Sequence, residues 1–304
     1  MSTPASPDRR PVTLRRSWLF AGGAEREKLL ALCQSPVDVP IHELEDFTAP
    51  AQRPAARALI PALMAAWRGA GKVAAVRINP LFSADGPLDL AACFADPATG
   101  VPDCVLMPKV SEPEQVLRLD AAVAAHEAAC DLPPGTVEIV PNIELARGLM
   151  QTYAIASCSP RVSACLVASE DMAADLGAER GQDGRELAYV RERFHLECRA
   201  AGVVSIDCPY TFTDKAGAEA ETIDARRLGM SAKSCVRLDH AALINQILTP
   251  SPEAVARAER MIAAFDAAQA NGQGTVALDG VNLELPIILN ARRLLARAAA
   301  FAAL

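Results

Sequence analysis

The stretch VEIVPNIELARGLMQTYAIA, residues 137–156, decides the fold. Its first part, residues 137–143, is a short apolar run with β-branched side chains, which is typical of a buried strand. Its second part, residues 146–156, is rich in alanine, leucine and methionine and predicts a helix. A buried strand followed directly by a helix is the repeating unit of parallel sheets that helices cover.

Seven further runs of the same kind occur along the chain. Together the eight runs occupy residues 17–21, 37–44, 73–78, 104–110, 137–143, 162–168, 203–206 and 233–237. Most are spaced by about 25 to 36 residues, the length of one strand-plus-helix unit. Helices are predicted between them at residues 25–33, 54–69, 113–130, 146–156, 186–201 and 215–228. Eight repeats predict an α/β protein with a (β/α)8 TIM barrel, and a doubly wound open sheet is the alternative.

The repeat ends after the eighth run. Ser251 and Pro252 are start signals for a long amphipathic helix that reaches Ala270, NGQG breaks it, and Pro286 begins a last helix. We therefore expect a disordered N-terminus over residues 1–13, a barrel over residues 14–249 and a C-terminal helical extension over residues 250–304. The extension is too small for a stable independent domain, so we expect it to pack on the barrel or on a neighbouring subunit.

Composition restricts the class of protein. The chain has 304 residues, 51% of them hydrophobic, and a formal net charge of −7. This charge argues against a nucleic acid partner but leaves anionic small molecules open, because a few buried arginines can bind them. No apolar run approaches the ~20 residues that cross a membrane, and the first residues lack the apolar core of a secretory signal. The nine cysteines form no CxxC pair, so we expect reduced, mostly buried thiols in a cytoplasmic protein.

Charged residues end or follow five successive predicted strands. They are Glu45 and Asp46, Arg77, Lys109, Glu144 and Arg147, and Glu170 and Asp171. In a parallel barrel the carboxyl ends of all strands meet at one mouth, where active sites form. Carboxylates that converge there repel one another unless a cation lies among them, and their hard oxygens suit Mg²⁺ or Mn²⁺. Because arginine binds a carboxylate through two parallel hydrogen bonds, Arg77 is a candidate anion-binding residue. A metal that faces an arginine suits chemistry that builds an enolate.

Eight motifs follow one another along nearly the whole chain: RRSWLFAGG, LEDFTAP, VRINP, MPKV, NIELARG, ASEDMAADLG, IDCPYTFTD and LDGVNLELP. In this order they resemble the HpcH/HpaI aldolase and citrate lyase β-subunit (CitE-like) family. The resemblance implies a (β/α)8 barrel that assembles as trimers or hexamers. It also implies Mg²⁺ and a reaction that cleaves or forms carbon–carbon bonds in 2-hydroxy or 3-hydroxy acids, often as coenzyme A or acyl-carrier thioesters.

The resemblance implies roles for three charged residues of the mouth. The glutamate of NIELARG is Glu144 and the aspartate of ASED is Asp171, and these two would be the protein ligands of Mg²⁺. The arginine of VRINP is Arg77, which would bind the substrate carboxylate and stabilise the enolate.

Further positions follow from the same resemblance. Glu45 and Asp46 of LEDFTAP would hold metal-bound water and take part in catalysis. Ala168 and Ser169 would contact the substrate together with Glu144. The turn at residues 21–23 would shape the floor of the pocket.

Four positions depart from the family's usual motifs. The first turn is AGG (residues 21–23) instead of VPG, and Ala168 replaces a glycine. After the eighth strand, VRL (residues 236–238) replaces IHP. Near the C-terminus Glu284 occupies the position of an aspartate that, in thioester-cleaving relatives, acts from a neighbouring subunit. These changes leave the metal site intact and alter the thioester side.

We therefore expect a Mg²⁺-dependent lyase of the retro-aldol or retro-Claisen type. Its substrate would be a 2-hydroxy or 3-hydroxy acid or its CoA thioester, such as citramalyl-CoA or malyl-CoA, and a 2-oxo acid would be released. Glu284 of a partner subunit would return a proton to the enolate. Two alternatives remain open: a citrate lyase β-subunit-like component that acts on an acyl-carrier thioester, and a non-catalytic dicarboxylate-binding paralogue.

Other residues allow competing interpretations. Lys109 at a strand end is where Schiff-base aldolases place their lysine, but a charge partner in the mouth is the favoured interpretation. His42 is expected to be structural. His240 follows the altered strand-eight motif and is a candidate replacement for the missing histidine.

Overall fold

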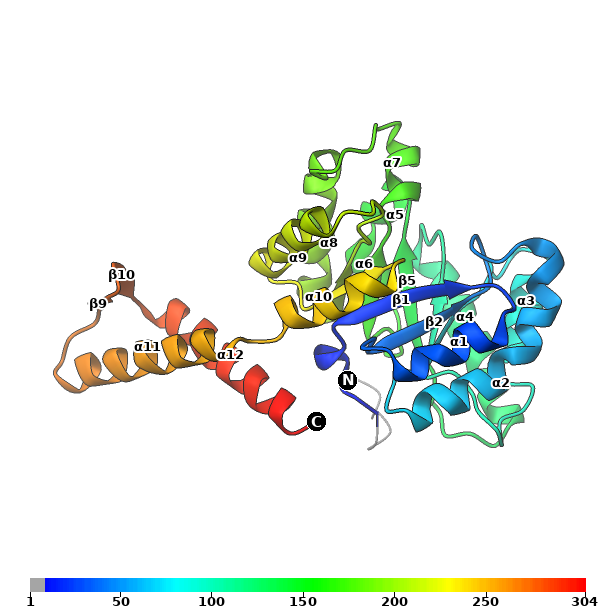
Figure 1. Cartoon of the computed structure of the whole chain (residues 1–304), viewed down its shortest axis with the longest axis horizontal. Helices are drawn as coiled ribbons and strands as arrows, with labels where there is room; N and C mark the ends of the chain where they lie inside the picture. The colour runs from blue at the N-terminus through cyan, green and yellow to red at the C-terminus, as the bar shows by residue number, and fades with distance from the viewer. Residues whose placement is uncertain (1–8) are drawn as a thin grey trace. The chain divides into compact units, whose positions relative to one another are not determined.

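A closed barrel of eight parallel strands forms the centre of the computed structural model, which describes residues 9–304 (Figure 1). Each strand pairs with the next one along the chain, and β8 closes the barrel against β1. The strands are β1 Ser17–Gly22, β2 Val39–Glu43, β3 Ala75–Arg77, β4 Cys104–Met107, β5 Glu138–Ile143, β6 Ala164–Val167, β7 Val204–Asp207 and β8 Ala232–Cys235. The predicted (β/α)8 barrel is confirmed, and the open sheet is ruled out.

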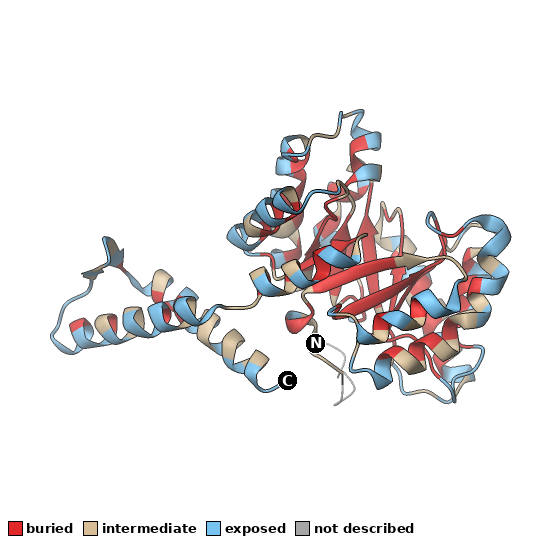
Figure 2. Cartoon of the chain, viewed as in Figure 1, coloured by how far each residue is buried: buried red, intermediate tan, exposed pale blue. Residues whose placement is uncertain are grey.

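Helices follow the strands and cover the outside of the barrel. They are α1 Arg26–Ala31, α2 Arg53–Gly69, α3 Gly86–Cys93, α4 Pro113–Ala129, α5 Ala146–Leu149, α6 Thr152–Ser157, α7 Glu170–Leu176, α8 Ala188–Ala201, α9 Lys215–Leu228 and α10 Leu238–Leu248. Short 3-10 helices occur at η1 Val12–Leu14, η2 Leu32–Gln34, η3 Pro50–Gln52 and η4 Arg185–Leu187. The strands are almost wholly buried, whereas the helices alternate buried and exposed faces (Figure 2).

The helix predicted at residues 146–156 is wrong in one respect, because it is divided into α5 and α6. Gly148 lies so close to the loop between β4 and α4 that a β-carbon there would approach the carbonyl oxygen of Val110 to 2.2 Å. The first turn is thereby pressed onto that loop, and the Gln151 side chain then donates to the Ser111 carbonyl at 3.0 Å. Helices α3, α7 and α10 were not predicted.

Apolar side chains fill the barrel. The buried cluster contains Trp18, Phe20, Val39, Ile41, Val73, Ala75, Cys104, Leu106, Val140, Ala164, Leu166, Ile206 and Ala232. Most of them occur as pairs at positions i and i+2, as expected because alternate residues of a strand point to the same face. This packed interior fixes the positions of the strand ends that carry the charged residues.

Residues 247–304 form a second compact unit. It consists of α11 Pro252–Ala270, the antiparallel hairpin β9 Val276–Leu278 and β10 Val281–Leu283, and α12 Leu285–Ala302. Its small core is built on Phe265, Leu283 and Ile288. The predicted start of α11 is confirmed, because the Ser251 side chain caps it by accepting from the Ala254 amide at 3.2 Å.

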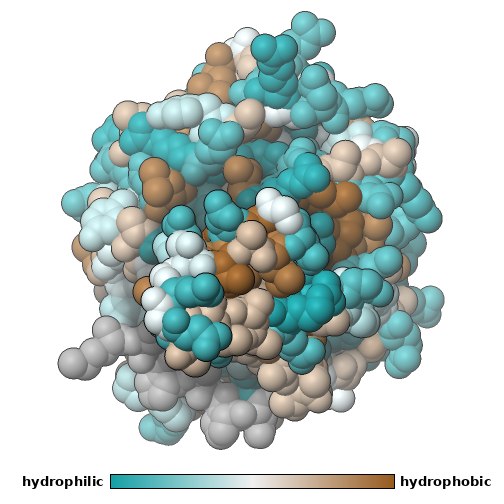
Figure 3. Space-filling view, turned by 90° about the vertical axis from the view of Figure 1, so that its left-hand side faces the viewer, coloured by the Kyte–Doolittle hydropathy of each residue, from teal (hydrophilic) through white to brown (hydrophobic). Residues whose placement is uncertain are grey.

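The second unit leaves apolar side chains at its surface. Leu285 and Leu289 of α12 are 55% and 42% exposed. In the space-filling view, hydrophobic patches are interspersed with hydrophilic ones on the face that Figure 3 shows.

The beginning of the described chain is held in place by ion pairs. Arg9 contacts Glu138 at 3.0 Å and Asp103 at 3.1 Å, and η1 follows at once. The expected disorder is therefore wrong for residues 9–13, because these buried ion pairs fix them. Residues 1–8 of that expected segment lie outside the described residues.

The cysteines agree with the sequence-based expectation. All nine are free, and six of them are buried. Across residues 9–304, none of the helices is long and apolar enough to span a lipid bilayer.

Candidate active site

The predicted metal-site residues meet at the carboxyl end of the barrel. Arg77 ends β3, Glu144 follows β5 directly, and Asp171 lies in the first turn of α7. They line a cavity of about 80 Å³. The remaining lining residues are Phe20, Asp46, Phe47, Leu166, Ala168, Ser169, Glu170, Pro209, Thr211 and Val236.

Arg77 is the buried cation of this cavity. Its Nε donates to Glu43 at 3.0 Å, and its terminal nitrogens lie 3.3 Å from Glu45 and 3.6 Å from Glu144. Its guanidinium also lies over the ring of Phe20, 4.8 Å from the centroid. Burial alone would lower the pKa of Arg77, but the surrounding carboxylates raise it, so the side chain stays charged. A fixed cation at this point can bind a carboxylate or an oxyanion.

Glu43 was not predicted as a site residue. It is fully buried, and its carboxylate accepts from the backbone amides of Glu45 and Phe47, both at 2.6 Å. Together with the bond from Arg77, these contacts fix the loop that carries Glu45 and Asp46. Alternation along β2 could have identified Glu43 from the sequence. His42 and Glu43 face opposite sides of the strand, so a structural His42 on the outside of the barrel places Glu43 on the inside.

Glu45 and Asp46 share the ammonium group of Lys109. Lys109 Nζ hydrogen-bonds Glu45 and lies 3.4 Å from Asp46. Burial alone would lower the pKa of Lys109, but Glu45 and Asp46 raise it above its usual value. A Schiff base needs a neutral amine, so this environment argues against that role and supports the charge-partner interpretation. The backbone of Lys109 has φ = 55°, a left-handed conformation uncommon outside glycine and common at functional sites.

Glu144 is buried and incompletely partnered. It is 0% exposed, and neither of its carboxylate oxygens has a hydrogen-bond partner among residues 9–304. Burial raises its pKa to about 8, Arg77 opposes this rise, and Asp171 and Glu45 add to it. A carboxyl group in this condition is stabilised when a cation binds beside it.

The charges at the mouth do not balance. Five carboxylates, from Glu43, Glu45, Asp46, Glu144 and Asp171, face the cations of Arg77 and Lys109. Five minus two leaves an excess of three negative charges when all are ionised. Glu144 and Asp171 offer hard oxygen ligands beside a cavity that has room for water, which is the donor set that Mg²⁺ prefers. The residues present therefore fit a magnesium site.

The other residues predicted at the substrate pocket either line the cavity or shape it through a neighbour. Ala168 and Ser169 line the cavity, and the Ser169 hydroxyl donates to the Pro209 carbonyl at 3.2 Å. Gly22 lies against the Phe47 loop, where a β-carbon would meet the Phe47 carbonyl oxygen at 2.5 Å. The turn at residues 21–23 therefore shapes the cavity through Phe47.

Three other predicted charged residues add no unpaired charge to the cavity in this chain. Arg147 is exposed and pairs with Glu112 at 2.9 Å. Glu170 lines the cavity but accepts from Thr211 at 2.5 Å and from Arg180 at 3.1 Å, so it is already partnered. Glu284 is exposed and directly precedes α12 in the second unit.

The two histidines considered above lie outside the cavity wall. His42 is fully buried, and its Nε2 lies 3.2 Å from the Gly23 carbonyl oxygen. Burial lowers the pKa of His42 to about 4, which fits a neutral packing residue. His240 packs near Tyr210, with ring centroids 6.1 Å apart, and is not among the cavity-lining residues.

A buried cluster of charged residues on β7, β8 and the adjoining helices was also missed. Asp207, Cys208 and Glu221 lie close enough together to hold a metal. The ammonium of Lys233, however, already binds Asp207 at 2.7 Å, Glu221 at 2.6 Å and the Cys208 carbonyl at 2.6 Å. The Lys233 ammonium therefore takes the place that a metal would occupy. Because Glu221 lies on α9 and Asp207 on β7, these bonds hold α9 against the barrel.

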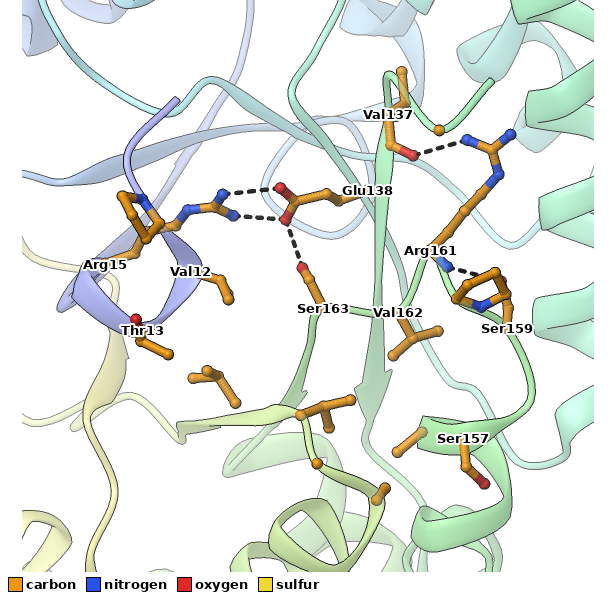
Figure 4. A pocket seen from close by; sticks show the side chains of 18 of the residues that line it. Val12, Thr13, Arg15, Val137, Glu138, Ser157, Ser159, Arg161, Val162 and Ser163 are labelled. Atoms are coloured by element: carbon orange, nitrogen blue, oxygen red, sulfur yellow. Dashed lines mark hydrogen bonds and ion pairs between the residues drawn. The ribbon is translucent and has the colours of Figure 1, made fainter. Parts of the chain in front are cut away.

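A larger cavity, of about 570 Å³, lies at the opposite end of the barrel (Figure 4). Its charged side chains are paired with one another or with neighbouring carboxylates. Arg15 binds Glu138 at 2.6 and 2.8 Å, Ser163 donates to the same carboxylate, and Arg161 binds Glu127 at 2.7 Å. Burial would raise the pKa of Glu138, but Arg15 and Arg9 lower it to about 2, so it stays ionised. These groups are committed to structural ion pairs.

Comparisons with known proteins agree with this geometry. A family model described as HpcH/HpaI aldolase/citrate lyase matches residues 16–237. The citrate lyase subunit beta of Haemophilus influenzae is 32% identical over 94% of this chain and 98% of its own length. The L-malyl-CoA/beta-methylmalyl-CoA lyase of Rhodobacter capsulatus is 30% identical over 92% and 93%. The solved structure of CitE from Mycobacterium tuberculosis, in complex with magnesium, acetoacetate and coenzyme A, superimposes with a TM-score of 0.76 at 27% identity and covers 93% of this chain and 98% of that one.

Proposed function

The chain belongs to the HpcH/HpaI aldolase and citrate lyase family and is a Mg²⁺-dependent lyase, and we propose that it splits a 2-hydroxy or 3-hydroxy acid, free or as its CoA thioester, and releases a 2-oxo acid. Malyl-CoA and citramalyl-CoA are the proposed substrates. The observation that carries the proposal is the uncompensated carboxylate set beside Arg77, in which Glu144 has no hydrogen-bond partner among the described residues.

In this proposal Glu144 and Asp171 hold Mg²⁺. When bound, Mg²⁺ stabilises negative charge on the oxygens of the substrate and product. Arg77 binds the substrate carboxylate and lies beside the oxygen on which charge develops, because its guanidinium is already oriented by Glu43. Lys109 holds Glu45 and Asp46 in place, and these two orient water at the mouth.

The electron movement is that of a retro-aldol or retro-Claisen cleavage. A base takes the hydroxyl proton, the O–H electrons form the carbonyl of the 2-oxo acid, and the carbon–carbon bond electrons pass to the departing fragment as an enolate. That enolate then takes up a proton. We propose that Glu284 of a partner subunit supplies it from its protonated carboxyl group, since Glu284 is exposed on the second unit.

Glu284 in that role requires an assembly of copies, and we propose a homotrimer or hexamer. Residues 250–304 would be a C-terminal extension that packs on the barrel or on a neighbouring subunit. The exposed Leu285 and Leu289 support this function for the extension. Nine free thiols support a reducing compartment, so we propose a cytoplasmic enzyme.

The test is a cleavage assay on malyl-CoA and citramalyl-CoA that follows release of glyoxylate or pyruvate, with and without Mg²⁺. We expect activity that depends on Mg²⁺ and is lost in Asp171→Ala. Silence on every thioester in a protein that still binds Mg²⁺ and a 2-oxo acid would reject the proposed CoA thioester substrates.

A second candidate is a β-subunit-like component that acts on an acyl-carrier thioester. The similarity to the citrate lyase beta subunit of H. influenzae over nearly its whole length favours it. The changed motif after β8 also favours it, because Val236 lines the cavity. Activity on an acyl-carrier thioester and none on CoA thioesters would support this candidate. A non-catalytic dicarboxylate-binding paralogue would bind the acid and leave every thioester intact.

A further inference from the structure

Asn142 on β5 is a polar residue inside the barrel that the proposed mechanism does not use. It is 0% exposed, and neither its amide nitrogen nor its amide oxygen has a hydrogen-bond partner among residues 9–304. Alternate residues of a strand share one face, so Asn142 lies on the face that Val140 and Glu144 occupy. Val140 belongs to the barrel core, and Glu144 lines the cavity.

The register of the neighbouring strand gives the same location. The Cα of Asn142 pairs with Leu166 of β6, which belongs to the barrel core and also lines the cavity. Asn142 therefore lies in the layer directly beneath the candidate metal site. An amide buried there without a partner destabilises the folded protein, which indicates that it forms a hydrogen bond once the site is loaded.

Asn79, another buried asparagine, provides a comparison, because both its side-chain and its backbone nitrogen have hydrogen-bond partners. Asn79 is 4% exposed, and its amide donates to the Leu44 carbonyl at 2.8 Å and to Asp89 at 2.7 Å. Its backbone amide also donates to Asp89 at 2.8 Å. The two residues have the same chemistry and similar burial, and they differ in their partners.

We propose that Asn142 is a positioning residue for Glu144. The two side chains do not hydrogen-bond each other in this structure, and the Asn142 amide would donate to the Glu144 carboxylate when Mg²⁺ is held there. Carboxylates that bind metals are themselves usually held by hydrogen bonds, and these contacts orient the ligand. Arg77 is the nearest cation to Glu144, but it lies 3.6 Å away and its Nε is engaged by Glu43. Asn142 supplies a neutral donor two residues away on the same face.

The inference rests on the proposed function, since it assigns a role toward the same metal site. Its test is calorimetric titration of Mg²⁺ into the wild type and into Asn142→Leu, which replaces the amide by an apolar group of similar size. We expect Mg²⁺ affinity to fall by about 10- to 100-fold. The thermal midpoint of the metal-free variant should stay the same or rise, because an unpartnered buried amide has been removed.

Asn79→Leu is the matched control for stability. It removes an amide that has partners, so its thermal midpoint should fall. Asn142→Ser keeps a donor in a smaller side chain and should lose less Mg²⁺ affinity than Asn142→Leu.

Several outcomes overturn the inference. One is wild-type Mg²⁺ affinity in Asn142→Leu, and a second is a reversed order of the serine and leucine variants. A third is a fall in the midpoint of metal-free Asn142→Leu as large as that of Asn79→Leu, because the amide would then be structural. A wild type that binds no Mg²⁺ would overturn the proposed function together with this inference. If the wild type binds Mg²⁺ and Asn142→Leu binds it equally well, only this inference fails.

Discussion

The two ends of the barrel differ both in size and in how their charges are paired. The amino end holds a cavity of about 570 Å³, and its wall residues Arg15, Glu138 and Arg161 all lie in ion pairs. The carboxyl end holds a cavity of about 80 Å³, where Glu144 is buried without a hydrogen-bond partner among the described residues.

This difference is the reason for assigning the proposed ligand site to the smaller cavity, since incomplete pairing is a better guide to a binding site than volume. A buried polar group in a folded protein normally has its partners, so an exception calls for an explanation. At the amino end Arg15, Glu138 and Arg161 find their charge partners within the fold, and these ion pairs stabilise it. At the carboxyl end Glu144 lacks such partners among the described residues, and in the proposed function a cation and an acid supply them.

Removal of Asp171 should give the largest effect and the sharpest contrast between the ends. Asp171→Ala removes one of the two proposed Mg²⁺ ligands. Loss of a single oxyanion donor lowers the rate by up to about 10³-fold, and we expect kcat/KM to fall by more than this. The variant should fold as well as the wild type, because its removal lessens repulsion of Glu144. Steady-state kinetics and Mg²⁺ titration check this, and EDTA treatment of the wild type should reproduce the loss. Retained activity would break the assignment of this end as the catalytic one.

Glu138 tests the opposite end. Glu138→Gln leaves the buried Arg15 without its carboxylate, whereas Arg9 keeps Asp103, and breaking such a buried pair costs about 3–5 kcal/mol of unfolding free energy. Urea unfolding measures this loss. The kcat of the folded fraction should remain that of the wild type, and a large fall in kcat would mean that the amino end takes part in the reaction.

Arg77 is expected to give the next largest effect, on catalysis. Arg77→Met removes the cation beside the developing oxyanion, and kcat should fall by about 10²- to 10³-fold. Arg77→Lys retains the charge without the two-bond geometry and should recover part of the rate. A variant that changed only KM would show that Arg77 contributes to binding alone.

The pH dependence of Mg²⁺ affinity sharpens the contrast further. Burial raises the pKa of Glu144 to about 8, so Mg²⁺ must displace a proton at lower pH. Affinity should therefore rise about tenfold per pH unit up to pH 8 and level off above it. In the metal-free protein the same shift acts on stability in the opposite direction. The contribution of Glu144 to stability is fully present below its unfolded pKa and is lost as pH rises toward 8. Isothermal titrations between pH 6 and 9 check the first statement, and a flat profile would contradict it.

Lys109 should give the smallest of these effects. Lys109→Met frees Glu45 and Asp46 from their shared ammonium, and kcat/KM should fall by about 10-fold, as for other groups that support a metal site indirectly. Borohydride should not trap a 2-oxo acid on the wild type. Trapping at Lys109 would restore the Schiff-base interpretation.

Sequence patterns predicted the barrel because every strand is a short apolar run at a regular interval. They also predicted that Arg77, Glu144 and Asp171 lie together, because the carboxyl ends of parallel strands converge. This prediction needs only the positions of the residues relative to the strand ends. They did not predict Glu43, since it lies inside a strand and its role depends on bonds to Arg77 and to the backbone of Glu45 and Phe47.

The remaining omissions also depend on three-dimensional contacts. Lys233 binds Asp207 and Glu221, which are far from it in sequence, and no local pattern brings these three together. The missing partners of Asn142 follow from what surrounds it on β4 and β6, and the residue itself gives no sign of them.

The free thiols have a consequence for the kinetics of opening of this barrel. Cys104, Cys165 and Cys235 lie on β4, β6 and β8, and all three are buried. Burial raises the pKa of the Cys235 thiol to about 12 and that of Cys104 well above its usual range. The thiolate is the form that attacks an alkylating reagent, so each of these positions reacts only when its strand is exposed to solvent. Alkylation followed by mass spectrometry would therefore time the opening of alternate strands without any introduced label, and the order in which the three thiols react would show where the closed barrel first comes apart.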